Sequence, residues 1–238
     1  MTDRAASNTA AGVAWLNAAH QVIDSSPRIL DDPVIVRLVG ATVEAISERR
    51  DRFQSPGARA LRSHVVLRSR FAEERLAKAV DGGVRQYVIL GAGLDTFAYR
   101  QPDWASGIRI FEVDQPATQL VKRQRVAAAS LLTEPAIDAV LRTIASLPRS
   151  SEIVFTFAQP RTPDPDTSGG PSLAERAAAM GEPWVTFFEP AALERMLVAF
   201  GFSSVGFLSV DEANERYFRD RIDALPPPQR GSIAFATV

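Results

Sequence analysis

The chain contains no cysteine among its 238 residues. This absence excludes disulfide bonds, thiolate nucleophiles and cysteine metal ligands together. Histidine is almost as scarce, since His20 and His64 are the only two. Both occupy helical positions near the N-terminus, where we expect surface or packing roles. A metal site is therefore disfavoured, and so is a mechanism that needs a histidine base.

The chain also lacks an excess of either charge and any long apolar run. Its 27 basic residues balance 28 acidic ones, and the net charge is -1. Electrostatics therefore gives no reason to expect a nucleic acid or an anionic membrane as partner. No apolar stretch is long enough to span a bilayer, and the first residues lack the apolar region of a secretion signal. We expect a soluble, cytoplasmic protein.

The strongest pattern runs from Gln86 to Pro116. Residues 87–90 are four consecutive apolar residues, which predicts a strand buried on both faces. Residues 91–93, Gly-Ala-Gly, let the backbone turn sharply and approach a ligand closely. A second apolar run, 108–113, ends in Asp114, about 20 residues past the glycines, where a Rossmann-type site places an acid on ribose hydroxyls. The pattern predicts an adenosine-bearing cofactor at the carboxyl ends of parallel strands.

The identity of that cofactor is a separate question. The dinucleotide fingerprint requires a third small residue at the position of Thr96. NAD is therefore disfavoured but stays open.

Two arginines could contribute to the same site. Arg68 and Arg70 lie two residues apart on a predicted helix and so point in different directions. A guanidinium that reached the cofactor would suit a carboxylate, which it can bind with two parallel hydrogen bonds. Spacing alone favours the alternative, in which both arginines are solvated and form ion pairs with Glu73 and Glu74.

The order of predicted elements indicates an α/β fold in a single domain. Residues 1–82 form a helical cap, and residues 83–238 form a Rossmann-like core with a lid at about 159–189. Helices are expected at 7–23, 34–50, 63–80, 116–129, 133–147, 172–180, 190–200 and 211–224, and strands at 87–90, 108–113, 151–158, 205–210 and 232–238. No strand separates the helices at 116–129 and 133–147, although a doubly wound sheet needs one after each crossover helix.

Six stretches carry a resemblance to a known family. They are LRSRFAEERL (67–76), QYVILGAGLDTFAYR (86–100), FEVDQPATQLVKR (111–123), LTEPAIDAVLRTIASLPRSSEIVF (132–155), GEPWVTFFEP (181–190) and NERYFRDR (214–221). Over nearly its whole length the chain resembles the leucine carboxyl methyltransferase-like family of S-adenosylmethionine (SAM)-dependent methyltransferases, especially its actinobacterial branch. The resemblance implies a class I methyltransferase fold with a doubly wound, mostly parallel sheet, SAM as cofactor and a small-molecule acceptor.

The resemblance also implies roles for single residues. Arg68 is similar to the family arginine that binds the methionine carboxylate of SAM, contrary to the interpretation from spacing. Residues Gly91, Ala92 and Gly93 correspond to the loop against which the amino-acid portion of SAM lies. Asp114, with its neighbour Gln115, corresponds to the ribose-binding acid.

The chain departs from the family pattern after Ser130. A strand–helix–strand unit, roughly 30 residues or more, is missing there, and in the family it carries the residues that bracket the adenine. Either the protein has an internal deletion, or the sequence omits a segment of the molecule. In a true deletion the strand at 151–158 must move beside the strand at 87–90, or unpaired backbone groups remain, each costing about 1–3 kcal/mol if buried. We then expect SAM to bind more weakly or not at all.

Three functions therefore remain open. The first is a SAM-dependent O-methyltransferase, and the lack of a convincing base favours a carboxylate acceptor, which needs no deprotonation. The second is a degenerate, non-catalytic relative that serves binding or assembly, and the third is an NAD(P)-dependent oxidoreductase. Six side chains could line an acceptor pocket: Tyr99, Trp184, Phe187, Phe188, Glu189 and Tyr217. Aromatic residues in such patterns more often belong to a core.

Overall fold

The computed structural model describes residues 8–114, 151–160, 186–223, 225–229 and 232–238. These residues belong to two compact units. The first contains the described parts of 8–114 and 210–229, and the second contains those of 151–209 and 232–238. The gap expected after Ser130, the helices expected at 116–129, 133–147 and 172–180, and most of the expected lid lie outside the described residues.

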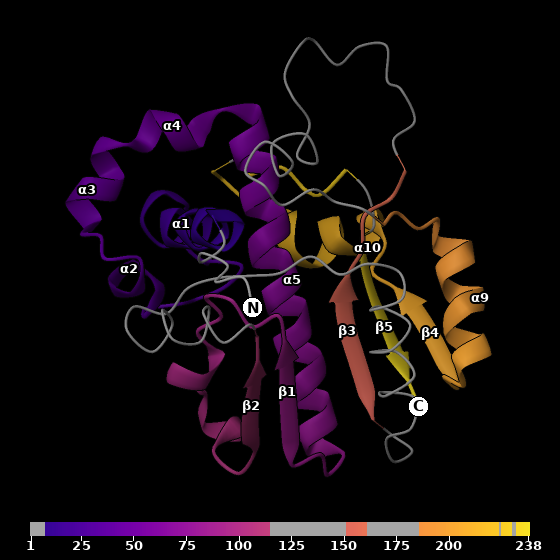
Figure 1. Ribbon diagram of the computed structural model, residues 1–238. Helices are drawn as coiled ribbons and strands as arrows, with labels where there is room; N and C mark the ends of the chain where they lie inside the picture. The colour runs from indigo at the N-terminus through magenta and orange to yellow at the C-terminus, as the bar shows by residue number, and fades with distance from the viewer. Residues whose placement is uncertain (1–7, 115–150, 161–185, 224, 230–231) are drawn as a thin grey trace, which may run out of the picture. The chain divides into compact units, whose positions relative to one another are not determined.

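The first unit begins with a layer of helices, drawn in indigo and purple in Figure 1. The long helices α1 (Asn8–Ile23) and α5 (Pro56–Asp81) pack together, and three short helices, α2 (Ile35–Leu38), α3 (Val43–Glu48) and α4 (Arg50–Gln54), connect them. Their shared apolar core includes Ala14, Ala18, Ala19, Ile35, Ile46, Phe53 and Val65. These alanines of α1 are almost completely buried in this core.

The prediction of one helix over residues 34–50 is wrong. Gly40 adopts a positive φ of 69°, which a helix cannot continue, and α2 ends before it. Thr42 then caps α3, because its hydroxyl accepts a hydrogen bond from the Ala45 amide at 3.2 Å. The connection therefore folds as three short helices.

The third helix begins earlier than the expected start at Ser63. The Ser55 hydroxyl accepts a hydrogen bond from the Ala58 amide at 3.3 Å, and Pro56 occupies the first helical turn. Serine at the cap and proline in the first turn are standard signals of a helix start. α5 therefore extends over 26 residues.

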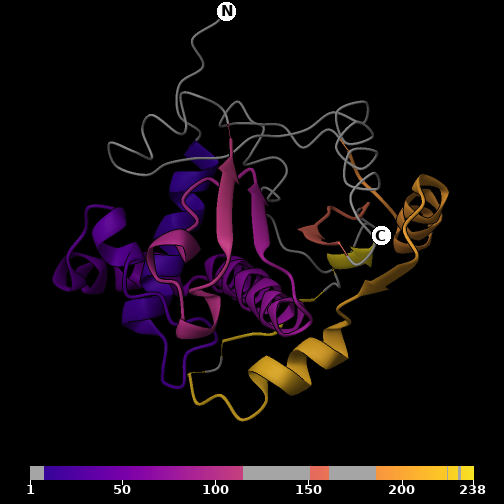
Figure 2. The ribbon, with the colours of Figure 1, turned by 90° about the horizontal axis from the view of Figure 1, so that it is seen from below.

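The strands β1 (Gln86–Leu90) and β2 (Arg109–Val113) pair in parallel, with Leu90 opposite Val113, which confirms the predicted pair. One face of the pair packs against Leu76 of α5 and Phe97; Figure 2 shows α5 beside the two strands. The other face is partly open, since the side chains of Val88, Leu90, Phe111 and Val113 are 44–50% exposed. The prediction of a strand buried on both faces is therefore wrong, because among the described elements α5 and the short turns cover a single face.

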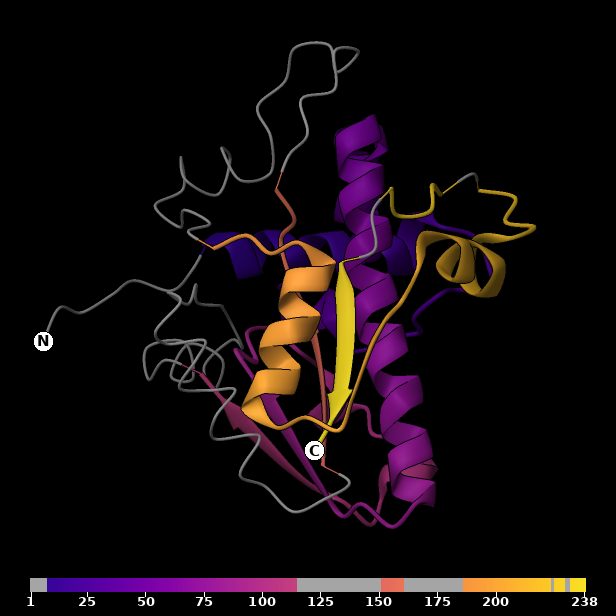
Figure 3. The same ribbon diagram turned by 90° about the vertical axis from the view of Figure 1, so that its right-hand side faces the viewer.

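The second unit combines a three-stranded sheet with one helix. Strand β5 (Ile233–Thr237) lies between β3 (Glu152–Thr156) and β4 (Ser204–Phe207) and is antiparallel to both, so that β3 and β4 run in the same direction. Helix α9 (Pro190–Phe200) packs on this sheet (Figure 3), with Leu193 and Leu197 fully buried against small residues of β5. Gly201 ends α9 at a φ of 102°, which confirms the predicted helix.

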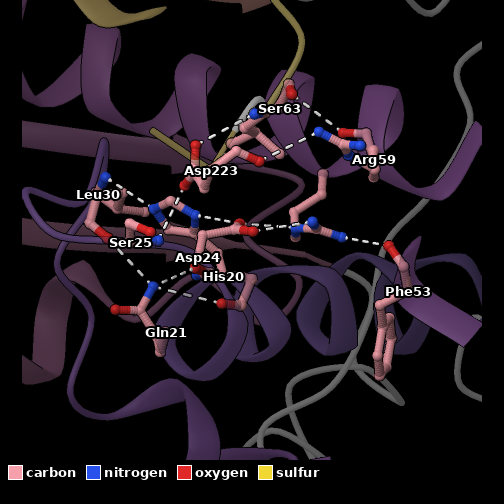
Figure 4. Close-up of polar contacts among 12 residues, drawn as sticks. His20, Gln21, Asp24, Ser25, Leu30, Phe53, Arg59, Ser63 and Asp223 are labelled. Carbon is pink, nitrogen blue, oxygen red and sulfur yellow. Dashed lines mark hydrogen bonds and ion pairs between the residues drawn. The ribbon is translucent and has the colours of Figure 1, made fainter. Parts of the chain in front are cut away.

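The segment that follows β4 returns to the first unit. Its expected helix at 211–224 is shorter, comprising α10 (Val210–Ala213) and a π-helical turn, η3 (Asn214–Phe218). The Tyr217 hydroxyl donates to Glu74 of α5 at 2.8 Å. Farther along, the Asp223 carboxylate accepts a hydrogen bond from the Ser25 amide at 2.9 Å (Figure 4). Through these two hydrogen bonds the segment 210–223 binds to the helical cap.

No helix in the described part of the chain is both long and apolar enough to cross a membrane.

Candidate functional site

The glycine turn after β1 and the acid after β2 lie against each other. The Gly91 amide donates to the Val113 carbonyl at 2.8 Å, and the Gly93 amide donates to Asp114 Oδ2 at 2.7 Å. Gly91 and Gly93 have φ values of 61° and 44°, which strain any residue with a side chain. At Gly91 an added Cβ would meet nothing within 4 Å. The glycine there serves the backbone conformation, and among the described residues nothing fills the space beside Gly91.

The structure brings together four of the six residues predicted to bind the cofactor. Ala92 is buried between the two glycines, and its amide also donates to the Val113 carbonyl, at 3.3 Å. Gln115 lies outside the described residues. Gly91, Ala92, Gly93 and Asp114 thus lie together at the carboxyl ends of β1 and β2.

The two arginines of α5 have different surroundings. Arg70 is half exposed and pairs with Glu74 at 2.7 Å, as the solvated alternative predicted. Arg68 is partly buried; burial lowers the pKa of its guanidinium, and the nearby Asp95 carboxylate only partly offsets that effect. Within the described residues the Arg68 side chain forms no hydrogen bond and no ion pair closer than 4 Å. Among the described residues, Arg68 is therefore a desolvated cation close to Asp95, two residues past the glycine turn, and its guanidinium suits an anion.

A buried polar network that sequence reasoning missed lies behind the turn. Thr96 donates to Asp32 Oδ2 at 2.6 Å and accepts from Arg100 Nε at 2.9 Å. Asp32 is fully buried and also accepts from Asn17 of α1 at 2.9 Å. Arg100 in turn donates two hydrogen bonds to Glu73 of α5, from Nη1 to Oε2 at 3.1 Å and from Nη2 to Oε1 at 2.5 Å. Glu73 was expected to form an ion pair with Arg68 or Arg70, and instead it binds Arg100.

The backbone after the turn does not suit a pyrophosphate. Dinucleotide sites place that group at the free N-terminus of a helix. Here only a three-residue turn follows, η1 (Phe97–Tyr99), and the Phe97 amide already donates to Asp95 Oδ1 at 2.8 Å. A carboxylate thus already takes a backbone donor that a phosphate would need. This geometry argues against NAD more directly than the identity of Thr96 does.

Neither histidine is placed to act as a strong base. His20 is fully buried, with its Nδ1 2.8 Å from Asp24 (Figure 4). Asp24 also binds Arg62 through two contacts of 2.7 Å and 2.9 Å. Because its ring is enclosed by protein, His20 has a packing role, as predicted. His64 lies one helical turn before Arg68, and burial together with the charge of Arg68 lowers its pKa to about 4. Such a weakly basic imidazole cannot readily remove a proton from an alcohol.

His64 should make the fold sensitive to acid. Its pKa is about 4 in the folded protein and near 6.5 when unfolded, so between these values only the unfolded chain binds the proton. Stability therefore falls as the pH decreases from 6.5 to 4, by about 1–3 kcal/mol. Urea unfolding at several pH values should show a smaller loss for His64→Gln than for the unmodified protein. Parallel pH curves for the two would contradict the assignment.

The side chains proposed for an acceptor pocket have different surroundings. Tyr99 is 53% exposed, Tyr217 is bound to Glu74, and Phe188 packs in the core of the second unit. Phe187 is exposed and Glu189 immediately precedes α9. Trp184 lies outside the described residues. An acceptor site at these positions stays a prediction.

Comparison with known sequences identifies the relatives of this chain. Residues 10–146 match the family model described as leucine carboxyl methyltransferase. The "Putative S-adenosyl-L-methionine-dependent methyltransferase YktD" of Bacillus subtilis is 28% identical over 205 residues, covering 67% of each chain. Proteins with the same description from Mycobacterium avium and Frankia alni are 38% and 36% identical, over 56% and 57% of this chain but only 44% and 53% of their own lengths. The chain thus spans about half the length of these two relatives.

The extent of the YktD alignment bears on the expected gap. The alignment covers 205 residues, whereas 67% of the 238-residue chain is about 160 residues. YktD therefore contains residues inside the aligned region that have no counterpart in this chain.

Solved structures add little. The SAM-dependent methyltransferase SibL is 15% identical over 77% of this chain and 59% of its own, with a TM-score of 0.37. A similarity this low carries no argument about the fold. The family model, in contrast, covers more than half of the chain and includes the glycine turn, Asp114 and Arg68. The chain belongs to the leucine carboxyl methyltransferase family.

Proposed function

We propose that the chain is a SAM-dependent O-methyltransferase that acts on a small molecule, with a carboxylic acid as the preferred acceptor class. The observation that carries the proposal is the contact between Gly93 and Asp114, together with the buried guanidinium of Arg68, which interacts with Asp95 two residues past Gly93. Family membership supports the same assignment.

The residues at the turn fit the chemical groups of SAM. The Arg68 guanidinium suits the methionine carboxylate, since a desolvated cation binds an anion strongly. The left-handed glycines let the ligand's amino-acid portion lie against the backbone. Asp114 uses one carboxylate oxygen for Gly93, and such an acid can also accept hydrogen bonds from ribose hydroxyls. When bound, SAM supplies a methyl group that is already activated by a sulfonium centre.

The scarcity of effective bases supports a carboxylate acceptor. A hydroxyl acceptor must lose its proton during transfer, and a carboxylate is ionised before it binds. In the described residues His20 is enclosed and the pKa of His64 is lowered to about 4. The protein's task is then to align the acceptor with the methyl group and to exclude water.

Calorimetric titration tests the cofactor assignment. We expect saturable binding of SAM and S-adenosylhomocysteine (SAH), no binding of NAD, and at least a tenfold loss of SAH affinity in Asp114→Asn. Asp103→Asn removes an exposed carboxylate outside the site and should change nothing. Binding of NAD, or an Asp114→Asn variant with unchanged SAH affinity, would overturn the assignment.

The acceptor class is tested with SAM labelled on its methyl group. A panel of small carboxylic acids should give methyl esters, which release methanol in alkali, whereas a panel of phenols should give no alkali-stable methyl ethers.

A non-catalytic relative is the second candidate, and the residues of YktD that lack a counterpart here favour it. A chain without an adenine clamp would keep the partners of the ribose and the carboxylate but lose affinity. Absence of binding to SAM, SAH and NAD in the same titration would support this candidate.

A further inference from the structure

Arg100 connects the two parts of the proposed cofactor site. Its Nε donates to Thr96, three residues after Gly93, at 2.9 Å. Its two terminal nitrogens donate to the carboxylate of Glu73 on α5, at 3.1 Å and 2.5 Å. Glu73 lies five residues after Arg68 on the same helix. A single guanidinium therefore ties the glycine turn to the helix that carries Arg68.

The anchor of this connection is rigid. The Arg100 side chain is only 9% exposed, and its Nε is 3.5 Å from Asp32 Oδ1. Asp32 is held in turn by Asn17, by Thr96 and by the amides of Val34 and Ile35, at distances from 2.6 Å to 3.2 Å. A carboxylate with four donors in addition to Arg100 does not reorient easily. Movement of the turn relative to α5 would have to break this network.

We propose that Arg100 is a positioning residue that sets the place of Arg68 relative to the glycine turn. The inference rests on the proposed function, because it assumes that Arg68 binds the methionine carboxylate. A fork with two parallel hydrogen bonds fixes both the distance and the rotation of α5. Lysine preserves the charge but not the fork. Loss of the fork should therefore weaken the hold on the carboxylate and leave the nucleoside contacts unchanged.

Two ligands separate these contributions. SAH carries the carboxylate, whereas 5′-methylthioadenosine has the same nucleoside and sulfur without the amino acid. In Arg100→Lys we expect SAH affinity to fall about tenfold or more, the scale of a lost charge-assisted hydrogen bond. Affinity for 5′-methylthioadenosine should change less than about twofold. Arg109→Lys, at an exposed arginine of β2, is the matched control and should alter neither affinity.

Thr96 provides an independent test and a rescue. Thr96→Val removes the hydroxyl that joins Arg100 to Asp32 and should reproduce the selective loss of SAH affinity. Thr96→Ser restores the hydroxyl and should restore binding. Should Arg100→Lys fail to fold, the double variant Glu73→Gln, Arg100→Gln removes both charges of the pair and leaves neither of the two unpaired.

Each outcome decides the question. If the unmodified protein binds neither ligand, the proposed function fails and this inference fails with it. If it binds SAH and Arg100→Lys binds equally well, only the positioning role is overturned. Equal losses for both ligands would show a general structural effect and would also overturn that role. A selective loss for SAH, rescued in Thr96→Ser, supports it.

Discussion

Replacement of Arg68 by glutamine should lower the affinity for SAH by about 30-fold or more. Truncating one partner of a desolvated charge pair costs about 2–5 kcal/mol, and 2 kcal/mol corresponds to about 30-fold. The fold should survive, because burial already disfavours the charge of this side chain, as its lowered pKa indicates. Calorimetry with SAH measures the affinity, and thermal unfolding checks that stability is unchanged.

Arg70→Gln is the control for this variant. Arg70 has the same chemistry on the same helix, but it is half exposed and pairs with Glu74. Exposed pairs of this kind contribute at most about 1 kcal/mol to stability, and SAH affinity should change less than twofold. Equal losses in Arg68→Gln and Arg70→Gln, or full affinity in Arg68→Gln, would remove Arg68 from the site.

Replacement of Arg62 by methionine should lower the free energy of unfolding by about 3–5 kcal/mol, the cost of leaving a buried charge without its partner. The side chains of Arg62 and Asp24 are 1% and 3% exposed and share two contacts, and Arg62 also donates to the Phe53 carbonyl at 2.7 Å. Burial by itself raises the pKa of Asp24, but hydrogen bonds from His20 and Arg62 outweigh it, and the net pKa is lowered. Asp24 therefore stays charged at neutral pH. Urea unfolding at pH 7 measures the loss.

Two further variants make this result specific. Arg219→Met removes an exposed arginine that pairs with Glu215 and should cost less than about 1 kcal/mol. The double variant Asp24→Asn, Arg62→Met removes both buried charges and should be more stable than Arg62→Met alone. A single variant as mild as Arg219→Met, or a double variant that is less stable still, would contradict the buried-pair explanation.

Local signals predicted the strand–turn–strand part of the fold. The glycines, the apolar runs and Asp114 act within about 25 residues of one another, and the structure pairs them as expected. The start of α5 also carried a local signal, in Ser55 and Pro56, although the helix was expected to begin only at Ser63. The break at Gly40 is different, because a helix interior tolerates glycine at modest cost, so the glycine alone did not predict the positive φ observed there.

The network behind the turn had no local signal. Thr96 and Asp32 are 64 residues apart, and Arg100 and Glu73 are 27 apart. A choice between Arg68 and Arg70 likewise depends on which side of α5 packs against the rest of the unit, and spacing alone does not determine that. Only the family resemblance selected Arg68 in advance.

The hydrogen bond between Ser25 and Asp223 has a consequence for biosynthesis, since the two residues are 198 positions apart. A ribosome that adds roughly 5–20 residues per second needs about 10–40 s to make the intervening chain. During that interval the N-terminal helices lack the segment around Asp223, whose carboxylate later accepts the hydrogen bond from Ser25. The Ser25–Asp223 contact can therefore form only after Asp223 has been made, and until then the nascent helices are exposed to chaperones and proteases.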